Sequence, residues 1–160
     1  MNDTWSFHLK YPPTPEYAAQ LAELMVEPAR TESEIDLDFS VNSLKQVDRV
    51  IRRMRREGAD AGQIATTLFG FGCYVGEVFV RNGRGQWRLT PETDFSGMTK
   101  SPMVIELGTQ QFCDPIFKVF NRFAHAREDG LPQFYRVHTR ALPDEPGKTA
   151  GLWKRMIGRR

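Results

Sequence analysis

Cysteines, long apolar runs and internal repeats are scarce or missing in this sequence. Only two of its 160 residues are cysteines, Cys73 and Cys113, and neither belongs to a Cys-x-x-Cys motif. This argues against a disulfide framework and a zinc site, and it suits a reducing cytoplasm, where we expect the protein to be. No apolar run approaches the roughly 20 residues of a membrane span. The first residues do not have the pattern of a secretory signal, and no repeat is visible at any useful period.

The remaining composition is typical of a globular domain. Hydrophobic residues make up 40% of the chain, charged residues 26% and aromatic residues 11%. A chain of this size buries roughly 70% of the surface that it exposes when unfolded. We expect a single domain over residues 1–140, followed by a linker and a basic tail over 141–160.

Hydrophobic periodicity and capping residues predict many helices and few, short strands. Thr14 followed by Pro15 predicts the start of the first helix, and Pro28 predicts its end. The later elements are expected at 34–39 (strand), 41–57 (helix), 60–80 (helix), 86–90 (strand), 103–107 (strand), 115–125 (helix) and 129–137 (a short element). The sequence therefore predicts a small α+β domain, with about four helices packed on a two- or three-stranded antiparallel sheet.

The segment 69–80 fits either a helix or a strand. Its three glycines each cost about 1 kcal/mol relative to alanine in a helix, which favours a strand. The apolar stripe that begins at Ile64 and reaches Val75 has helical spacing, which favours a helix. We predict a helix, with Gly72 and Gly76 one turn apart where another element can approach closely.

Several short motifs are spread over residues 35–138. They are Ser43-Leu44-x-x-Val47-Asp48, Gly72-x-Tyr74-x-Gly76-Glu77-Val78 with Arg81 and Gly85-x-Trp87 after it, Asp114-Pro115-x-x-Lys118-Val119, and Phe134-Tyr135. Together they resemble a bacterial family of small domains of unknown function that carries a Gly-x-Tyr-x-Gly-Glu segment. Asp114 stands where that family's pattern has asparagine, and either residue can cap a helix. The resemblance implies a fold but no activity. In size and plan the chain is also similar to small bacterial immunity-type proteins, which neutralise a toxin by binding it.

Glu77 is a carboxylate within the otherwise apolar run 69–80, where it would be costly without a partner. Arg81 follows four residues later, the favourable order for an ion pair on a helix. In one interpretation this pair forms the floor of a binding cleft whose walls are Tyr74 and Trp87. In the other, the pair only joins a helix to a strand. A hydrolase or transferase that uses Glu77 is a further alternative, but the sequence places no second titratable group beside it.

Lys118 and Arg122 lie on the predicted outer face of the helix at 115–125. They either form an anion site with Arg81 or belong to a solvated helix face. The chain has three histidines, His8, His125 and His138, and their spacing is not that of metal ligands. We expect no catalytic residue, no metal and no cofactor.

Five arginines and a lysine gather in the helix predicted at 41–57. One broad face, opposite the apolar stripe, carries Lys45, Arg49, Arg52, Arg53 and Arg56. These bases either hold phosphates or are solvated and pair with acids on neighbouring elements. No aromatic residues interleave with them, as they do in proteins that bind single-stranded nucleic acid.

The tail is basic and amphipathic. Leu152, Trp153, Met156 and Ile157 fall on one helical side, among the bases Lys154, Arg155, Arg159 and Arg160. Such a segment can lie on an anionic membrane, bind a nucleic-acid backbone, or dock on a partner or on its own domain. About eight residues are too few for a stable isolated helix in water.

These observations favour a non-catalytic, cytoplasmic protein-binding domain of immunity or accessory type. We expect its contacts at Tyr74, Glu77, Arg81, Trp87, Lys118 and Arg122, and in the tail at Trp153, Lys154 and Arg155. The alternative is an anion-binding accessory protein that contacts nucleic acid or a membrane surface through the arginine-rich helix and the tail. An aromatic-rich face on the helix at 115–125 could also support a homodimer.

Overall fold

The computed structural model describes residues 8–140 and 142, and it shows an α+β domain. The helices are α1 (Ala18–Glu23), α2 (Val26–Ser33), α3 (Leu44–Arg56), α4 (Ala65–Arg81), α5 (Pro115–Ala124) and α6 (Leu131–Thr139). The strands β1 (Gln86–Leu89), β2 (Met103–Leu107) and β3 (Gln111–Cys113) form an antiparallel sheet in that order. Short 3-10 turns lie at Pro15–Tyr17, Val41–Ser43 and Thr90–Glu92. The predicted fold class is confirmed.

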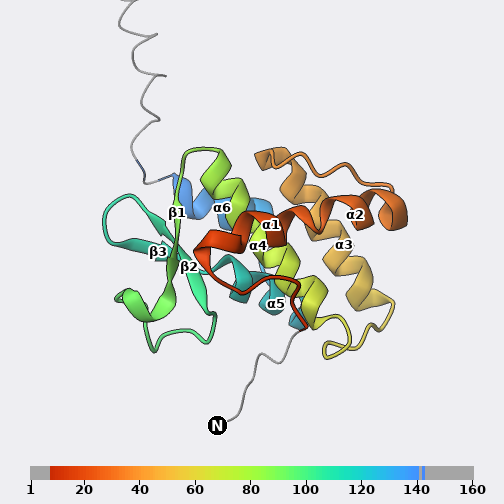
Figure 1. The fold of residues 1–160 in the computed structure, drawn as a ribbon. Coiled ribbons are helices and arrows are strands. Elements are labelled where there is room, and N and C mark those ends of the chain that lie inside the picture. Colours follow the sequence, from red (N-terminus) through yellow and green to blue (C-terminus); the bar gives the residue numbers. More distant parts are fainter. Residues whose placement is uncertain (1–7, 141, 143–160) are drawn as a thin grey trace, which may run out of the picture.

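Helix α4 forms the centre of the fold (Figure 1). Every residue from 68 to 79 is buried, and α4 packs chiefly against α1 and α5. A Cβ atom on Gly72 would lie 2.7 Å from the Cα of Ile116 in α5, and one on Gly76 would overlap the ring of Trp87. The helix over 69–80 is therefore confirmed, because close packing on several sides outweighs the poor helix propensity of the glycines.

The sheet lies at one end of α4 (Figure 1). In the pairing of β1 with β2, Trp87 lies opposite Ile105, and both side chains are in the core. The turn from β2 to β3 includes Gly108, whose φ of +56° a glycine adopts without strain. The two predicted strands are confirmed. Strand β3 was not expected, because its three residues are too few to show an alternating pattern.

The prediction of a strand at 34–39 is wrong. Ile35, Leu37 and Phe39 do turn inward while their neighbours are exposed, as the alternating pattern indicates. The segment pairs with no other strand of the described chain, and both of its end residues leave the extended conformation, with φ angles of +55° at Glu34 and +61° at Phe39. The N–H of Phe39 instead donates to the hydroxyl of Tyr74, at 2.8 Å. Alternation reports which side chains are buried, and it does not show whether a pairing strand is present.

The prediction that Pro28 ends the first helix is also wrong. Helix α1 ends at Glu23, the chain bends at Leu24 and Met25, and α2 begins at Val26. Pro28 therefore lies in the first turn of a new helix. A proline is tolerated there because the N–H that it lacks would have no acceptor within the helix.

The other predicted helix boundaries hold to within a few residues. The Oγ of Ser40 accepts the Ser43 N–H at 3.2 Å, and Gly58 follows α3 with a φ of +75°. Asp60 accepts the Gln63 N–H, but it caps a turn, so that α4 begins only at Ala65. The short element expected at 129–137 is helix α6.

Candidate functional site

Glu77 lies in the core on α4, with only 5% of its surface exposed. Its two carboxylate oxygens accept different donors. Oε1 accepts the indole N–H of Trp87 in β1, and Oε2 accepts Nε–H of Arg81, both at 3.0 Å. The ion pair of Glu77 with Arg81 that the sequence spacing predicts is present, and the Trp87 indole donates to the other carboxylate oxygen of Glu77.

Arg81 connects this network to the surface. Its Nη2 donates to Glu23 of α1 at 2.8 Å, and its guanidinium lies 3.6 Å from the centre of the Phe39 ring. The Arg81 side chain is 35% exposed. One arginine thus ties α4 both to α1 and to the segment that precedes α3.

Tyr74 is fully buried on the same helix. Its hydroxyl accepts the Phe39 N–H and lies 2.7 Å from the Oγ of Ser43. Burial raises the pKa of Tyr74, so the phenol stays neutral at physiological pH.

The structure therefore brings Tyr74, Glu77, Arg81 and Trp87 close together, but mainly inside the core. Tyr74 is inaccessible and Trp87 is 8% exposed, so neither offers a wall to solvent. A ligand for Glu77 would have to displace Trp87 or Arg81. This geometry matches the interpretation in which the pair joins a helix to a strand.

The prediction that Lys118 and Arg122 lie on a solvated outer face is wrong, since they are 7% and 6% exposed. The Nζ of Lys118 donates to Glu128 at 2.6 Å. Arg122 makes a bidentate pair with Asp48 of α3, at 2.8 and 3.1 Å. The chain after α5 folds back over this face: Ala126 accepts from Arg122, and Lys118 also faces the Phe134 ring of α6. Since Arg81 pairs with other acids, these contacts do not assemble a three-base anion site.

Asp48 completes a buried junction of α3, α5 and α6. It also accepts the Leu131 N–H at 3.0 Å. Burial raises the pKa of Asp48, but hydrogen bonds from Arg122 and the Leu131 N–H outweigh burial and hold the pKa below its usual range. The sequence analysis did not assign this role. The position of Asp48 beside Val47, on the inward side of the helix, could have indicated that its carboxylate is buried. Its partner, Arg122, could not be predicted because it lies 74 residues away in the sequence.

Four bases on the outer side of α3 form a surface that we call the basic face: Lys45, Arg49, Arg52 and Arg56. All four are exposed, and none makes a hydrogen bond or an ion pair with the residues that the structure describes. The other arginines of this helix are engaged. Arg53 donates to the Oγ of Ser33 at 2.6 Å. Arg55 donates to the backbone oxygens of Phe123 and Ala124. The basic face is thus solvated, but it does not pair with neighbouring acids.

A hollow of about 490 Å³ continues the basic face at the N-terminal end of α3. It lies between α3 and α6 and is lined by Val41, Asn42, Lys45, Pro132, Tyr135, Arg136 and Thr139. Its charged lining residues, Lys45 and Arg136, are both basic. An anionic group of a binding partner would therefore find two cations here.

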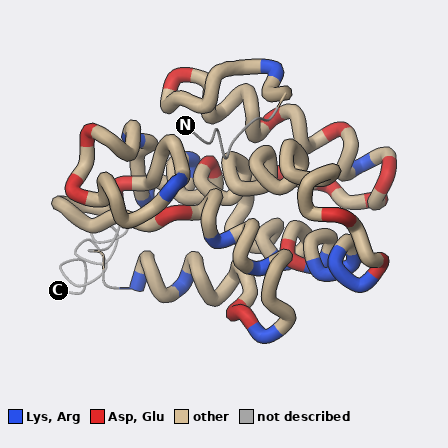
Figure 2. Tube along the Cα trace, turned by 90° about the horizontal axis from the view of Figure 1, so that it is seen from below, with Lys and Arg blue, Asp and Glu red and all other residues tan. Residues whose placement is uncertain are grey.

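Acids gather in the chain before α3. Residues 16–38, which we call the acidic segment, hold seven acids and one base, Arg30. All seven acids are exposed: Glu16, Glu23, Glu27, Glu32, Glu34, Asp36 and Asp38. Figure 2 shows Lys and Arg gathered along α3, with Asp and Glu spread along the segment that precedes it. The molecule thus presents separate basic and acidic surfaces.

Cys73 and Cys113 are free thiols in the core. Burial raises the pKa of both, and the nearby carboxylates of Glu77 and Asp114 add to the effect. Neither is an activated nucleophile. Among the described residues, no three His, Cys, Asp or Glu side chains come together in a way that could hold a metal ion.

Trp153, Lys154 and Arg155 lie outside the described residues. None of the helices at 8–140 is both long and apolar enough to cross a membrane. Comparison of the chain with known protein families, curated proteins and solved structures finds no match. The resemblance to a bacterial domain family therefore stays a prediction.

Proposed function

We propose that this chain is a non-catalytic protein-binding domain that docks an acidic surface of its partner on the basic face. The observation that carries this proposal is the set of exposed bases on α3 that pair with no acid of the described chain. Four like charges along about 16 Å of helix repel one another. A partner that brings acids to this face removes the repulsion.

A protein surface suits the basic face better than a long polyanion does. Residues 1–143 hold seventeen bases and eighteen acids, so most of the chain is nearly neutral. The acidic segment would repel a nucleic acid that extends beyond α3. A compact acidic patch on a protein can meet the bases and avoid those acids.

Charge reversal at Lys45 and Arg49 tests this proposal. An acid at position 45 is favourable in the first turn of α3, and Arg49→Glu places an acid four residues before Arg53, the stabilising order. Arg52 is left unchanged because its charge helps to lower the pKa of Asp48. These gains offset the roughly 0.2–0.5 kcal/mol of repulsion between the new acids at 45 and 49, so the double variant should keep its fold.

The readout is capture of a partner from nuclease-treated cell lysate. We expect a stoichiometric acidic protein with the wild type, and at least about tenfold less with Lys45→Glu/Arg49→Glu, or roughly 1.4 kcal/mol of binding free energy. The control, Lys100→Glu/Arg127→Glu, makes the same change of charge at exposed positions outside α3 and should capture normally. Equal capture by all three proteins would refute the proposal.

A second candidate is an anion-binding accessory protein that holds nucleic acid or an anionic membrane with the basic face and the tail. The same unpaired bases favour it, because phosphates could occupy the place of the missing acids. Titration of the full chain with a DNA duplex and with phosphatidylserine vesicles, each at two salt concentrations, separates this candidate from the first. Binding that falls steeply with salt supports it, and no binding or a flat salt response removes it.

An accessory role of immunity type in the cytoplasm belongs to the first proposal. The two free, buried thiols suit a reducing compartment. A hydrolase or transferase built on Glu77 has less support, because Trp87 and Arg81 already occupy both of its oxygens.

A further inference from the structure

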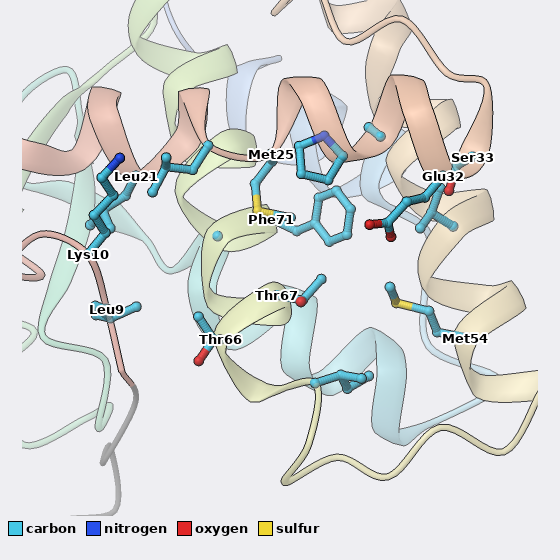
Figure 3. A pocket seen from close by; sticks show the side chains of 16 residues that line it. Leu9, Lys10, Leu21, Met25, Glu32, Ser33, Met54, Thr66, Thr67 and Phe71 are labelled. Atoms are coloured by element: carbon cyan, nitrogen blue, oxygen red, sulfur yellow. The ribbon is translucent and has the colours of Figure 1, made fainter.

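An apolar groove of about 480 Å³ lies beneath α1 and α2. Its volume falls within the roughly 300–1,000 Å³ of sites that bury a ligand. Figure 3 shows α1 and α2 along one side of the groove, α4 along the other, and α3 at one end. Much of the lining is apolar, and it includes Leu21, Met25, Met54, Ile64 and Phe71.

Charge enters the groove at its two ends (Figure 3). Lys10 lies at one end and Glu32 at the other, and they are the charged residues of the described lining. The carboxylate of Glu32 points toward Phe71 and makes no hydrogen bond or ion pair with the described residues. The wall that carries Glu32 is part of the acidic segment. A well-matched occupant therefore has an apolar side for the methionines and positive charge at the Glu32 end, away from Lys10.

The chain itself contains a segment with this chemistry. Residues 152–157 place four apolar side chains on one helical side, and residues 152–160 hold four bases and no acid. Grooves lined with methionine adapt well to the apolar side of a helix.

We propose that the groove binds the segment 152–157 by its apolar side, with the bases of the tail against the acidic segment. Docking would supply the stabilisation that so short a helix lacks in water. Nine residues, 143–151, link Leu142 to the segment and span at most about 32 Å, so the segment docks in the groove of its own chain where this linker is long enough and in that of a second copy where it is not. The occupant is the same in both cases. This inference does not depend on the function proposed for the basic face.

Cysteine crosslinking in the full chain tests the docking. One variant carries Thr67→Cys on the floor of the groove and Met156→Cys in the segment. The control variant carries Thr109→Cys with Met156→Cys. Thr109 is exposed beside Gly108, against which Leu142 lies, so an undocked tail would meet it more often. The native cysteines do not compete, because both are buried.

Docking predicts that the Thr67 pair crosslinks about fivefold faster than the Thr109 pair, since binding raises the local concentration of the tail at the groove. A crosslinked monomer or a crosslinked dimer supports the proposal equally and shows which copy supplies the segment. A Thr67 pair that reacts no faster than the Thr109 pair overturns it.

A charge variant tests the match between the tail and the acidic wall. Glu32→Lys, added to the Thr67 pair, should slow crosslinking about threefold or more, because the new lysine repels the bases of the tail. Glu16→Lys is the matched control, since Glu16 is an exposed acid of the same segment that does not line the groove. An unchanged rate with Glu32→Lys overturns the charge match.

Discussion

Asp48 and Asp114 are buried carboxyls whose surroundings move their pKa values in opposite directions. Burial raises the pKa of both, but the Arg122 guanidinium reverses the effect at Asp48. Among the described residues Asp114 has no such charged partner: it caps α5 through the Phe117 N–H and accepts hydrogen bonds from the hydroxyl groups of Thr99 and Ser101. Its pKa therefore stays above the usual range. A charged partner decides whether burial of a carboxylate stabilises or strains the fold.

The two carboxyls should give stability opposite dependences on pH. The pKa of Asp48 is lower in the folded state than in the unfolded state. Its carboxylate therefore contributes its full stabilisation of the fold above the usual pKa of 3.8, and this stabilisation is lost as the pH falls through the folded pKa. The pKa of Asp114 is higher in the folded state than in the unfolded state. Its carboxyl group therefore contributes its full stabilisation of the fold below pH 3.8, and this stabilisation is lost as the pH rises through the folded pKa. Urea unfolding across the acid range measures both effects. Asp48→Asn should flatten the loss of stability in acid, and Asp114→Asn should gain stability relative to the wild type as the pH rises.

At neutral pH the same two substitutions should differ in cost. Asp48→Asn removes the acid that pairs directly with the buried Arg122 guanidinium and should cost about 3–5 kcal/mol in free energy of unfolding. Asp114→Asn keeps an amide oxygen for the Phe117 N–H, and it should stay within about 1 kcal/mol of the wild type. Equal losses in the two variants, measured by urea titration, would contradict this assignment of roles.

At the scale of elements, α4 shows most clearly what the sequence could predict. The apolar stripe from Ile64 to Val75 predicted a helix correctly, and the glycine spacing predicted the close approaches. The stripe did not reveal that α4 is covered on all sides over 68–79. That burial depends on α1 and α5, which come from distant parts of the chain. Local spacing predicts an element, and its neighbours decide how much of it is buried.

The same limit explains the errors. Lys118 and Arg122 follow a surface pattern on α5, but α6 and the turn before it cover them. Segment 34–39 alternates like a strand, but the sheet forms elsewhere. In both cases the missing information was non-local.

Gly72→Ala tests the close approach of α4 and α5. The added Cβ would meet the Cα of Ile116 at 2.7 Å, and backbone atoms move less readily than a side chain. We expect a loss of about 2 kcal/mol or more, although alanine gains about 1 kcal/mol in helix propensity. In the control, Gly62→Ala, the new Cβ meets only the side-chain oxygen of Asp60. Thermal unfolding of the two variants measures the difference, and a Gly72→Ala protein as stable as the wild type would contradict the packing described here.

At the scale of the whole molecule, charge is used in two ways. Inside, Glu77, Asp48 and their partners hold helices and strands together. Outside, the basic face and the acidic segment lie on different parts of the surface. The basic face could be predicted from the sequence because a helical pattern places its bases together. The internal pairs could be predicted only where both partners lie on one helix, as Glu77 and Arg81 do.

The central claim is that internal charges serve stability and the basic face serves binding. The most direct measurement determines the free energy of unfolding and partner capture side by side for Glu77→Gln and for Lys45→Glu/Arg49→Glu. We predict that Glu77→Gln loses about 1.5–3 kcal/mol of stability and keeps its partner, because its carboxylate only joins α4 to β1 and Arg81. The double variant should keep its stability and lose its partner. The opposite pattern, with capture lost in Glu77→Gln while its stability is intact, would show that the Glu77 network is the binding site and would contradict this account.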